Sequence, residues 1–318
     1  MYSIGIDLGG TNIAIGIVNE NWEIIKKGSV PTGADREPVA IVDDMAALLN
    51  SLVAEAGISF DEIIGAGIAS PGTVNCAEGK VAYANNLPFN NFPICPLLME
   101  RTPLKKVSID NDANAAALGE AAAGAAKDSV CSVMVTLGTG VGGGIIIDGK
   151  VYSGFNYAGA ELGHMVIVQG GEKCSCGRHG CWESYSSATA LIRMTREKML
   201  ESKDSIMWGM CENSIDKISG KTAFAASREG DAAGQAVVDE YLKYLACGLT
   251  NILNIFQPEI LSIGGGVSNE RDSLIVPLEK LIRVEEYGAS VVDRPFCKIK
   301  IAELRNDAGI IGAAALVR

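Results

Sequence analysis

Two stretches of this sequence repeat one pattern, an apolar strand followed by a glycine turn: Ile4-Gly5-Ile6-Asp7-Leu8-Gly9-Gly10-Thr11 and Val133-Met134-Val135-Thr136-Leu137-Gly138-Thr139-Gly140. A second apolar segment follows each turn, at Ile13 to Val18 and at Gly144 to Ile147. Polar residues and glycine close both segments, as they do in β-hairpins. The repetition therefore predicts two related domains, each of which begins with a β-hairpin.

The sequence around these hairpins predicts alternating helices and strands, and a length of 318 residues is typical of two domains. Apolar spacing and helix-breaking residues give the expected bounds. Helices are expected over residues 38–56, 113–126, 233–256 and 306–317, with an irregular helical stretch over 189–229, and strands over 63–69, 107–109 and 260–263. The expected fold class is α/β.

The composition excludes several classes of partner. A net charge of −11 and a sequence pI of about 4.8 argue against nucleic acid or an anionic membrane as the main partner. The apolar stretch from Ser129 to Ile147 is interrupted by glycines, and the N-terminal residues lack the pattern of a secretory signal. We therefore expect a cytoplasmic protein whose nine cysteines are reduced.

Three glycine turns predict a nucleotide site: Asp7-Leu8-Gly9-Gly10-Thr11-Asn12, Gly138-Thr139-Gly140 and Gly264-Gly265-Gly266. Glycine lets backbone N–H groups turn toward a phosphate, and a carboxylate such as Asp7 suits Mg²⁺. Any one of these turns alone could be an ordinary hairpin turn, but three together favour phosphate binding. None of them fits the P-loop or the dinucleotide-binding pattern.

A group of cysteines predicts a structural zinc site. Cys174, Cys176 and Cys181 offer three thiolates within eight residues, and His164 is a plausible fourth ligand. A closed tetrahedral site with three cysteines and one histidine is structural rather than catalytic. The alternatives are His179 as the fourth ligand, or three reduced cysteines in the core. The glycines between the cysteines predict a turn, which is a poor place to bury thiols.

Taken together, the motifs resemble those of the ROK family, which comprises bacterial sugar kinases and related repressors of the actin-like ATPase superfamily. The resemblance spans essentially the whole chain. The segments that carry it are Asp7 to Asn12, Ser70-Pro71-Gly72, Asn86-Leu87-Pro88, Asn111-Asp112-Ala113-Asn114, Gly138 to Gly144, Glu161-Leu162-Gly163-His164, Cys174 to Glu183, Gly264 to Ser268, and Asn306-Asp307-Ala308-Gly309.

The resemblance implies a two-domain actin-like (ribonuclease H-like) fold with a ligand cleft between the domains. The small domain would comprise residues 1–112 and 303–318, and the large domain residues 113–302. The resemblance further implies ATP and Mg²⁺ as cofactors, a hexose as substrate, and a homodimer or homotetramer.

Asp112 is the expected general base. A hydroxyl that attacks a γ-phosphoryl group needs a carboxylate to accept its proton. Taken alone, Asp112 could instead cap the alanine-rich helix that follows it. The resemblance favours the catalytic role, and it implies that Asn111 binds a sugar hydroxyl.

Further sugar ligands are expected on both sides of the cysteine group. Glu161 and Glu183 are carboxylates suited to sugar hydroxyls, and the resemblance implies that His164 binds zinc through one ring nitrogen and the sugar through the other. Gly72 and Thr73, after the Ser70-Pro71 turn, are the remaining candidates.

The expected reaction is transfer of the γ-phosphoryl group of ATP to a hexose, in first place to the 6-hydroxyl of glucose. Phe89-Asn90-Asn91 departs from the family pattern near the sugar loop, so fructose, mannose, allose, N-acetylglucosamine and N-acetylmannosamine are alternatives. A sugar-binding regulator without catalysis is another alternative. The family's repressors carry a helix-turn-helix ahead of the kinase-like core, and we expect none here because Asp7 follows only six residues.

Overall fold

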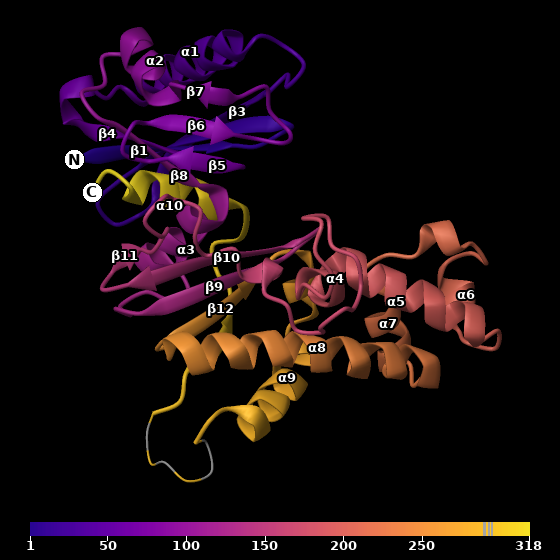
Figure 1. The fold of residues 1–318 in the computed structure, drawn as a ribbon. Coiled ribbons are helices and arrows are strands. Elements are labelled where there is room, and N and C mark those ends of the chain that lie inside the picture. Colours follow the sequence, from indigo (N-terminus) through magenta and orange to yellow (C-terminus); the bar gives the residue numbers. More distant parts are fainter. Residues whose placement is uncertain (289–290, 292, 294) are drawn as a thin grey trace. The chain divides into compact units, whose positions relative to one another are not determined.

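The computed structural model describes residues 1–288, 291, 293 and 295–318 (Figure 1). By its internal contacts the chain forms two compact units. The first comprises residues 1–134, 144–160 and 303–318, and the second comprises residues 135–143 and 161–302. The chain returns to the first unit at Glu303, and that unit extends beyond residue 112, where the sequence placed a boundary.

A five-stranded sheet, in the order β3-β2-β1-β4-β8, is the centre of the first unit. Its first three strands pair antiparallel, and β1, β4 and β8 pair parallel. Register brings Asp7 beside Ala69, and Ser70 beside Asn111. The carboxyl ends of three parallel strands therefore meet at one edge. The strands are β1 (Tyr2–Leu8), β2 (Asn12–Val18), β3 (Ile24–Pro31), β4 (Ile63–Ser70) and β8 (Val107–Asn111).

Helices α1 (Pro38–Ala56) and α2 (Ile94–Arg101) contribute buried side chains to the same core as this sheet. Helix α1 has the predicted bounds because Pro38 suits a first helical turn and Gly57, with φ +67°, ends the helix. A short 3-10 turn, η1 (Phe60–Glu62), leads into β4. The sequence did not predict a small sheet of β5 (Thr73–Asn75), β6 (Lys80–Tyr83) and β7 (Asn90–Phe92).

Helices α3 (Asp112–Ala123) and α10 (Ala308–Ala315) pack together through small residues. A Cβ built on Gly312 would lie 1.7 Å from the carbonyl oxygen of Ala115, so only glycine allows this approach. This packing explains why the first unit includes residues beyond 112. The predicted C-terminal helix divides into η5 (Arg305–Asp307) and α10.

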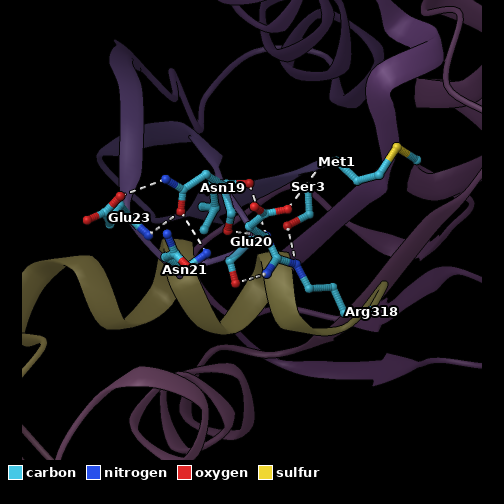
Figure 2. Close-up of polar contacts among 8 residues, drawn as sticks. Met1, Ser3, Asn19, Glu20, Asn21, Glu23 and Arg318 are labelled. Carbon is cyan, nitrogen blue, oxygen red and sulfur yellow. Dashed lines mark hydrogen bonds and ion pairs between the residues drawn. The ribbon is translucent and has the colours of Figure 1, made fainter.

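The C-terminal residue lies on the first β-hairpin (Figure 2). The Arg318 guanidinium donates to the carbonyl of Val18 at 3.1 Å and to the hydroxyl of Ser3 at 3.0 Å. It also lies 4.1 Å from the centre of the Trp22 ring, within cation–π range. In the same hairpin the Asn19 side chain accepts hydrogen bonds from two backbone N–H groups of the turn. The end of the chain is thus fixed to the strands that carry Asp7.

The second five-stranded sheet has the order β11-β10-β9-β12-β13. If its strands are counted along the chain, this is the order third, second, first, fourth, fifth, and the first sheet has the same order. The repeat expected from the two hairpins is therefore confirmed. The strands are β9 (Ser132–Leu137), β10 (Val141–Ile147), β11 (Lys150–Val151), β12 (Ile260–Gly264) and β13 (Lys298–Ile301).

Helices make up much of the second unit, and the longest, α8 (Ala232–Phe256), confirms the helix predicted over 233–256. It buries a stripe that includes Tyr241, Leu245 and Leu249. Within the described residues no helix is both long and apolar enough to cross a membrane. The other helical elements are η2 (Leu162–His164), α4 (Glu183–Ser186), α5 (Ala188–Glu201), α6 (Met207–Met210), η3 (Ile215–Lys217), α7 (Thr222–Arg228), η4 (Gly266–Glu270) and α9 (Asp272–Glu285).

Candidate active site

The first glycine turn joins β1 to β2 in the first unit. The N–H of Gly9 donates to the carbonyl of Asn12 at 3.0 Å, and Thr32 donates its hydroxyl to the carbonyl of Gly9 at 2.7 Å. Gly10 lies beside Asn86, whose Cβ would be 3.6 Å from a Cβ on Gly10. Thr32 and Asn86 therefore contact the turn from neighbouring segments, while Thr11 and Asn12 are exposed at its tip.

Asp7 is the residue before the last of β1, and its carboxylate is largely buried. A Cβ on Gly309 would lie 2.7 Å from the Asp7 carboxyl carbon, so the first turn of α10 covers this carboxylate closely. Burial raises the pKa of Asp7 to about 6, and the negative charge of Asp112 adds to the shift. Two predicted functional carboxylates of the first unit thus interact electrostatically.

Asn111, and not Asp112, caps helix α3. The side-chain oxygen of Asn111 accepts hydrogen bonds from the N–H groups of Ala113, at 2.9 Å, and Asn114, at 3.4 Å. Asp112 is the first residue of the helix, and burial raises the pKa of its carboxyl. Asn111 is therefore the N-cap, and Asp112 adds one further contact, since its Oδ1 atom accepts from the Ala113 N–H at 2.9 Å.

The Asn111 side chain also reaches the sugar loop predicted at Gly72 and Thr73. Its amide donates to the carbonyl of Gly72 at 3.1 Å. Gly72 has φ +88°, and a Cβ there would lie 2.2 Å from the carbonyl oxygen of Tyr83. Glycine is thus required at this turn for two separate reasons. The structure brings Gly72 and Asn111 together, and Thr73 begins β5 directly after the turn.

Asp110 is a supporting residue that the sequence reasoning did not select. Its side chain is 6% exposed, and it accepts hydrogen bonds from the Asn114 side chain at 2.9 Å and the Asn111 N–H at 2.7 Å. The carboxylate therefore holds both ends of the segment that presents Asp112. Its place near the end of the buried strand β8 was the signal that could have identified it, but Asn111 and Asp112 lie at the same strand-to-helix junction.

The second glycine turn joins β9 to β10, and a neighbouring segment holds it at three points within the second unit. Gly138 accepts from the N–H of Ala188 at 2.8 Å, and Thr139 accepts from the Thr189 hydroxyl at 2.8 Å. The N–H of Val141 donates to the Glu183 carboxylate at 3.0 Å. A Cβ on Gly138 would meet no atom within 4 Å, so this side of the turn is open.

The third glycine turn follows β12. Gly265 has φ +82°, and a Cβ there would lie 2.4 Å from the carbonyl oxygen of Leu137. The second and third turns are therefore neighbours within the second unit. Gly266 is open, with no atom within 4 Å of a Cβ, and Ser268 closes the turn by donating to the carbonyl of Gly265 at 2.8 Å.

The four predicted zinc ligands form a cluster. The ligand atoms of His164, Cys174, Cys176 and Cys181 all lie within 4.8 Å of one another. The Cys174 sulfur is 3.6 Å from His164 Nδ1, and the other two sulfurs are 3.7 Å apart. A tetrahedral zinc ion with Zn–S bonds of ~2.3 Å would separate its sulfurs by about 3.8 Å. The donor set and its spacing therefore fit zinc, whereas His179 is exposed and lies outside the cluster.

Backbone contacts shape the loop that carries these thiols. The N–H of Cys174 donates to the carbonyl of Arg178 at 2.8 Å, and Val166 pairs with Cys181 across an antiparallel bridge. The N–H of Trp182 donates to the carbonyl of Met165 at 2.8 Å. These contacts hold the segment after His164 against the segment that ends at Glu183.

The thiols influence one another's ionisation. Burial opposes ionisation of Cys174, but hydrogen bonds from Cys176, Cys181 and Ser175 outweigh it and lower its pKa to about 7. Burial and the neighbouring thiols raise the pKa of Cys181 to about 12. The first thiol to ionise thus makes ionisation of a second thiol less favourable. A bound cation would offset the repulsion between the two thiolates.

Glu161 and Glu183 stand on either side of the cysteine loop in sequence. Glu161 is exposed and precedes η2, where its carbonyl accepts from the N–H of His164 at 3.0 Å. Glu183 begins α4, and its carboxylate also accepts from the Ser175 hydroxyl at 3.2 Å. Glu161 is therefore tied to the cluster segment through its backbone carbonyl, and Glu183 through its carboxylate.

The predicted site residues fall into two groups, one in each unit. The first unit holds the base candidate and the first glycine turn, and the second holds the cluster and the other two turns. The first group is Asp7, Gly9, Gly10, Thr11, Asn12, Gly72, Thr73, Asn111 and Asp112, and the second is Gly138, Thr139, Gly140, Glu161, His164, Cys174, Cys176, Cys181, Glu183, Gly264, Gly265 and Gly266.

Comparison with known proteins identifies similar sequences along the whole chain. The sequence model of the ROK family matches residues 3–318. A glucokinase of Halalkalibacterium halodurans is 35% identical, over 99% of this chain and 94% of its own length. A glucokinase of Thermotoga maritima is 36% identical, over 99% of this chain and 96% of its own.

Solved structures give the same result. A ROK family glucokinase from Streptomyces griseus, in complex with glucose and AMPPNP, superposes with a TM-score of 0.79. It is 34% identical in sequence, and the match covers 99% of each chain.

Proposed function

The chain belongs to the ROK family, and we propose that it is an ATP-dependent sugar kinase that transfers the γ-phosphoryl group of ATP to the 6-hydroxyl of glucose. Full-length similarity to two glucokinases and to a glucokinase structure with glucose and a nucleotide analogue supports this proposal. The observation that carries the mechanism is the placement of Asp112 in the first turn of α3: Asn111 provides the N-cap, and burial raises the pKa of the Asp112 carboxyl, whose Oδ1 atom accepts from the Ala113 N–H.

Asp112 is the proposed general base. Burial raises the pKa of its carboxyl, so the carboxylate is more basic than an exposed aspartate. It would accept the proton of the attacking sugar hydroxyl as the bond to phosphorus forms. Asp110 and Asn111 would act as positioning residues, since they fix the backbone on both sides of this carboxylate.

The glycine turns are the proposed phosphate sites. The turns at Gly9 to Asn12 and at Gly138 to Gly140 each end a strand and begin the next, so their N–H groups can point away from the sheet. The turn at Gly264 to Gly266 is the proposed nucleoside site. Asp7 is a proposed ligand of Mg²⁺, which would neutralise phosphate charge during transfer.

Zinc is the proposed structural ion of the cluster formed by His164, Cys174, Cys176 and Cys181. Three thiolates and one imidazole make a closed donor set, which supplies stability rather than an open catalytic position. His164 would ligate through Nδ1, the ring nitrogen nearest to Cys174. Its other ring nitrogen is then available for a sugar hydroxyl, together with Glu161 and Glu183.

A coupled assay with Mg·ATP tests the proposed function directly. Glucose, mannose, fructose, allose, N-acetylglucosamine and N-acetylmannosamine would be compared at equal concentration. Turnover that is highest with glucose is expected. Faster turnover of another sugar would reassign the substrate, and no turnover of any sugar would leave a sugar-binding regulator as the function. A homodimer or tetramer and a cytoplasmic location stay predictions from the sequence.

A further inference from the structure

The Glu183 carboxylate joins two loops with different proposed ligands. Its Oε2 atom accepts from the N–H of Val141, directly after the second glycine turn, at 3.0 Å. Its Oε1 atom accepts from the hydroxyl of Ser175, in the cysteine loop, at 3.2 Å, and lies 3.9 Å from the sulfur of Cys174. One side chain thus connects the proposed phosphate turn to the proposed zinc loop.

Gly140 is shaped for this contact. A Cβ on Gly140 would lie 2.3 Å from Glu183 Oε2, so any larger residue would push the carboxylate away from the Val141 N–H. The φ angle of Gly140 does not lie in the left-handed region, so the backbone does not itself demand glycine. The placement of the Glu183 carboxylate is therefore what a side chain at this position would disturb.

The segment that begins at Glu183 holds the rest of the same turn. Ala188 donates to the carbonyl of Gly138, and Thr189 donates to the carbonyl of Thr139, each at 2.8 Å. The conformation of the turn is therefore tied to the placement of residues 183–189. Cys181, two residues before this segment, belongs to the cluster and fixes its other end.

We propose that Glu183 couples sugar binding to nucleotide binding by holding the glycine turn at Gly138 to Gly140 in its phosphate-binding conformation. This inference rests on the proposed function, in which Glu183 binds a sugar hydroxyl and the turn binds phosphate. A sugar that orders the Glu183 carboxylate also orders the turn through Val141. The nucleotide then loses less conformational entropy on binding, and by linkage the reverse holds.

Calorimetry on the full chain measures this coupling. The dissociation constant of glucose would be determined without nucleotide and with saturating AMPPNP. We expect AMPPNP to tighten glucose binding by about fivefold or more, and glucose to tighten AMPPNP binding by the same factor. Both ligands binding independently would overturn the inference and leave the proposed function intact. Failure of either ligand to bind would instead count against the proposed function.

Gly140→Ala is the decisive variant. Its methyl group would push the Glu183 carboxylate away from the Val141 N–H, although residue 183 is still a glutamate. The coupling factor is expected to fall to about twofold or less. Gly209→Ala, on α6 in the same unit, is the matched control, since its Cβ meets no atom within 4 Å and its φ is not positive, and it should retain the wild-type factor. A wild-type factor in Gly140→Ala would overturn the inference.

Glu183→Asp provides a second route if Gly140→Ala does not fold. Aspartate keeps the charge but is one methylene shorter, so it cannot span the distance to the Val141 N–H. The ratio of two affinities is independent of how weakly this variant binds glucose by itself. Loss of the coupling factor is expected, and its retention would contradict the proposed role of Glu183.

Discussion

The indole ring of Trp182 packs directly on Gly248 of helix α8. A Cβ on Gly248 would lie 2.1 Å from the ring, and the indole N–H donates to the carbonyl of Tyr244 at 3.0 Å. Trp182 is fully buried, and its neighbours in sequence are Cys181 and Glu183. Helix α8 thus fixes the place of a proposed zinc ligand and a proposed sugar ligand through one aromatic side chain.

Gly248→Ala should displace Trp182 and loosen both neighbours. Overpacking of this kind costs ~1–3 kcal/mol of stability. We expect a lower urea midpoint and a higher KM for glucose. Gly209→Ala, on α6, is the control, because its Cβ meets no atom within 4 Å and its φ is not positive. A glucose KM unchanged in Gly248→Ala would show that Trp182 does not position Glu183.

Asp112→Asn should abolish most phosphoryl transfer and leave glucose binding largely intact. Loss of a general base lowers turnover by about 100-fold or more. Asparagine has a similar shape, and the cap of α3 by Asn111 is retained, so the helix should keep its start. The coupled assay and calorimetry with glucose measure the two effects. Asp61→Asn, at an exposed carboxylate, is the control, and unchanged turnover in Asp112→Asn would refute its role as base.

The sequence predicted those parts of the fold that depend on local pattern. The hairpins, α1 and α8 follow from periodicity and from end signals such as Pro38 and Gly57. The sheet of β5, β6 and β7 did not follow, because its strands are short and Asn91 takes a positive φ of +47°. The helix predicted to reach Ala126 ends at Ala123, because the backbone after it bonds to the Glu120 carboxylate.

In the candidate site too, local sequence pattern predicted some features and could not predict contacts between distant residues. Spacing alone grouped Cys174, Cys176 and Cys181 with His164, because a short loop forces their side chains together. The choice between Asn111 and Asp112 as the helix cap could not be made from sequence, since both residue types are good caps. The contact between Glu183 and Val141 joins residues 42 positions apart, which no local pattern reveals.

Asp7→Asn should stabilise the ligand-free protein at neutral pH. The folded pKa of Asp7, about 6, lies above the ordinary aspartate pKa of 3.8, so the folded state binds more protons than the unfolded state between these values. The contribution of Asp7 to stability therefore falls as pH rises through this window and stays low above it. We expect the variant to be more stable by about 1–3 kcal/mol at pH 7.5.

Urea unfolding of wild type and Asp7→Asn at pH 7.5 and pH 4.5 measures this difference, since other titrating groups cancel between the two proteins. The advantage of the variant should shrink toward zero at the lower pH. An advantage that grows on acidification would contradict a raised pKa for Asp7.

Removal of the metal should destabilise the protein. The cluster holds the loop between His164 and Glu183, so a chelator is expected to lower Tm by about 5 °C or more. Elemental analysis should find one zinc per chain, and Cys176→Ser should lower that content. Cys247→Ser alters a cysteine outside the cluster and should keep it. A zinc-free protein with unchanged Tm would exclude a structural ion here.

Glu120→Gln should destabilise the first unit, because the Glu120 carboxylate is fully buried and serves three backbone donors. It accepts from the N–H groups of Ala125, at 2.7 Å, Glu303, at 3.1 Å, and Leu304, at 2.8 Å. A glutamine has only one acceptor oxygen, and its NH₂ group would face a backbone N–H donor where the second carboxylate oxygen now accepts. At least one backbone N–H would lose its partner, at a cost of roughly 2–4 kcal/mol.

The effect should extend to the residues that precede α10. Glu303 and Leu304 lead into the helix whose Gly309 lies against Asp7, so a displaced junction would alter the cover of that carboxylate. Urea unfolding measures the stability, and AMPPNP affinity should fall in Glu120→Gln. Glu303→Gln changes an exposed carboxylate at the same junction and should alter neither quantity. Equal stability of the two variants would mean that the buried carboxylate does not hold this junction.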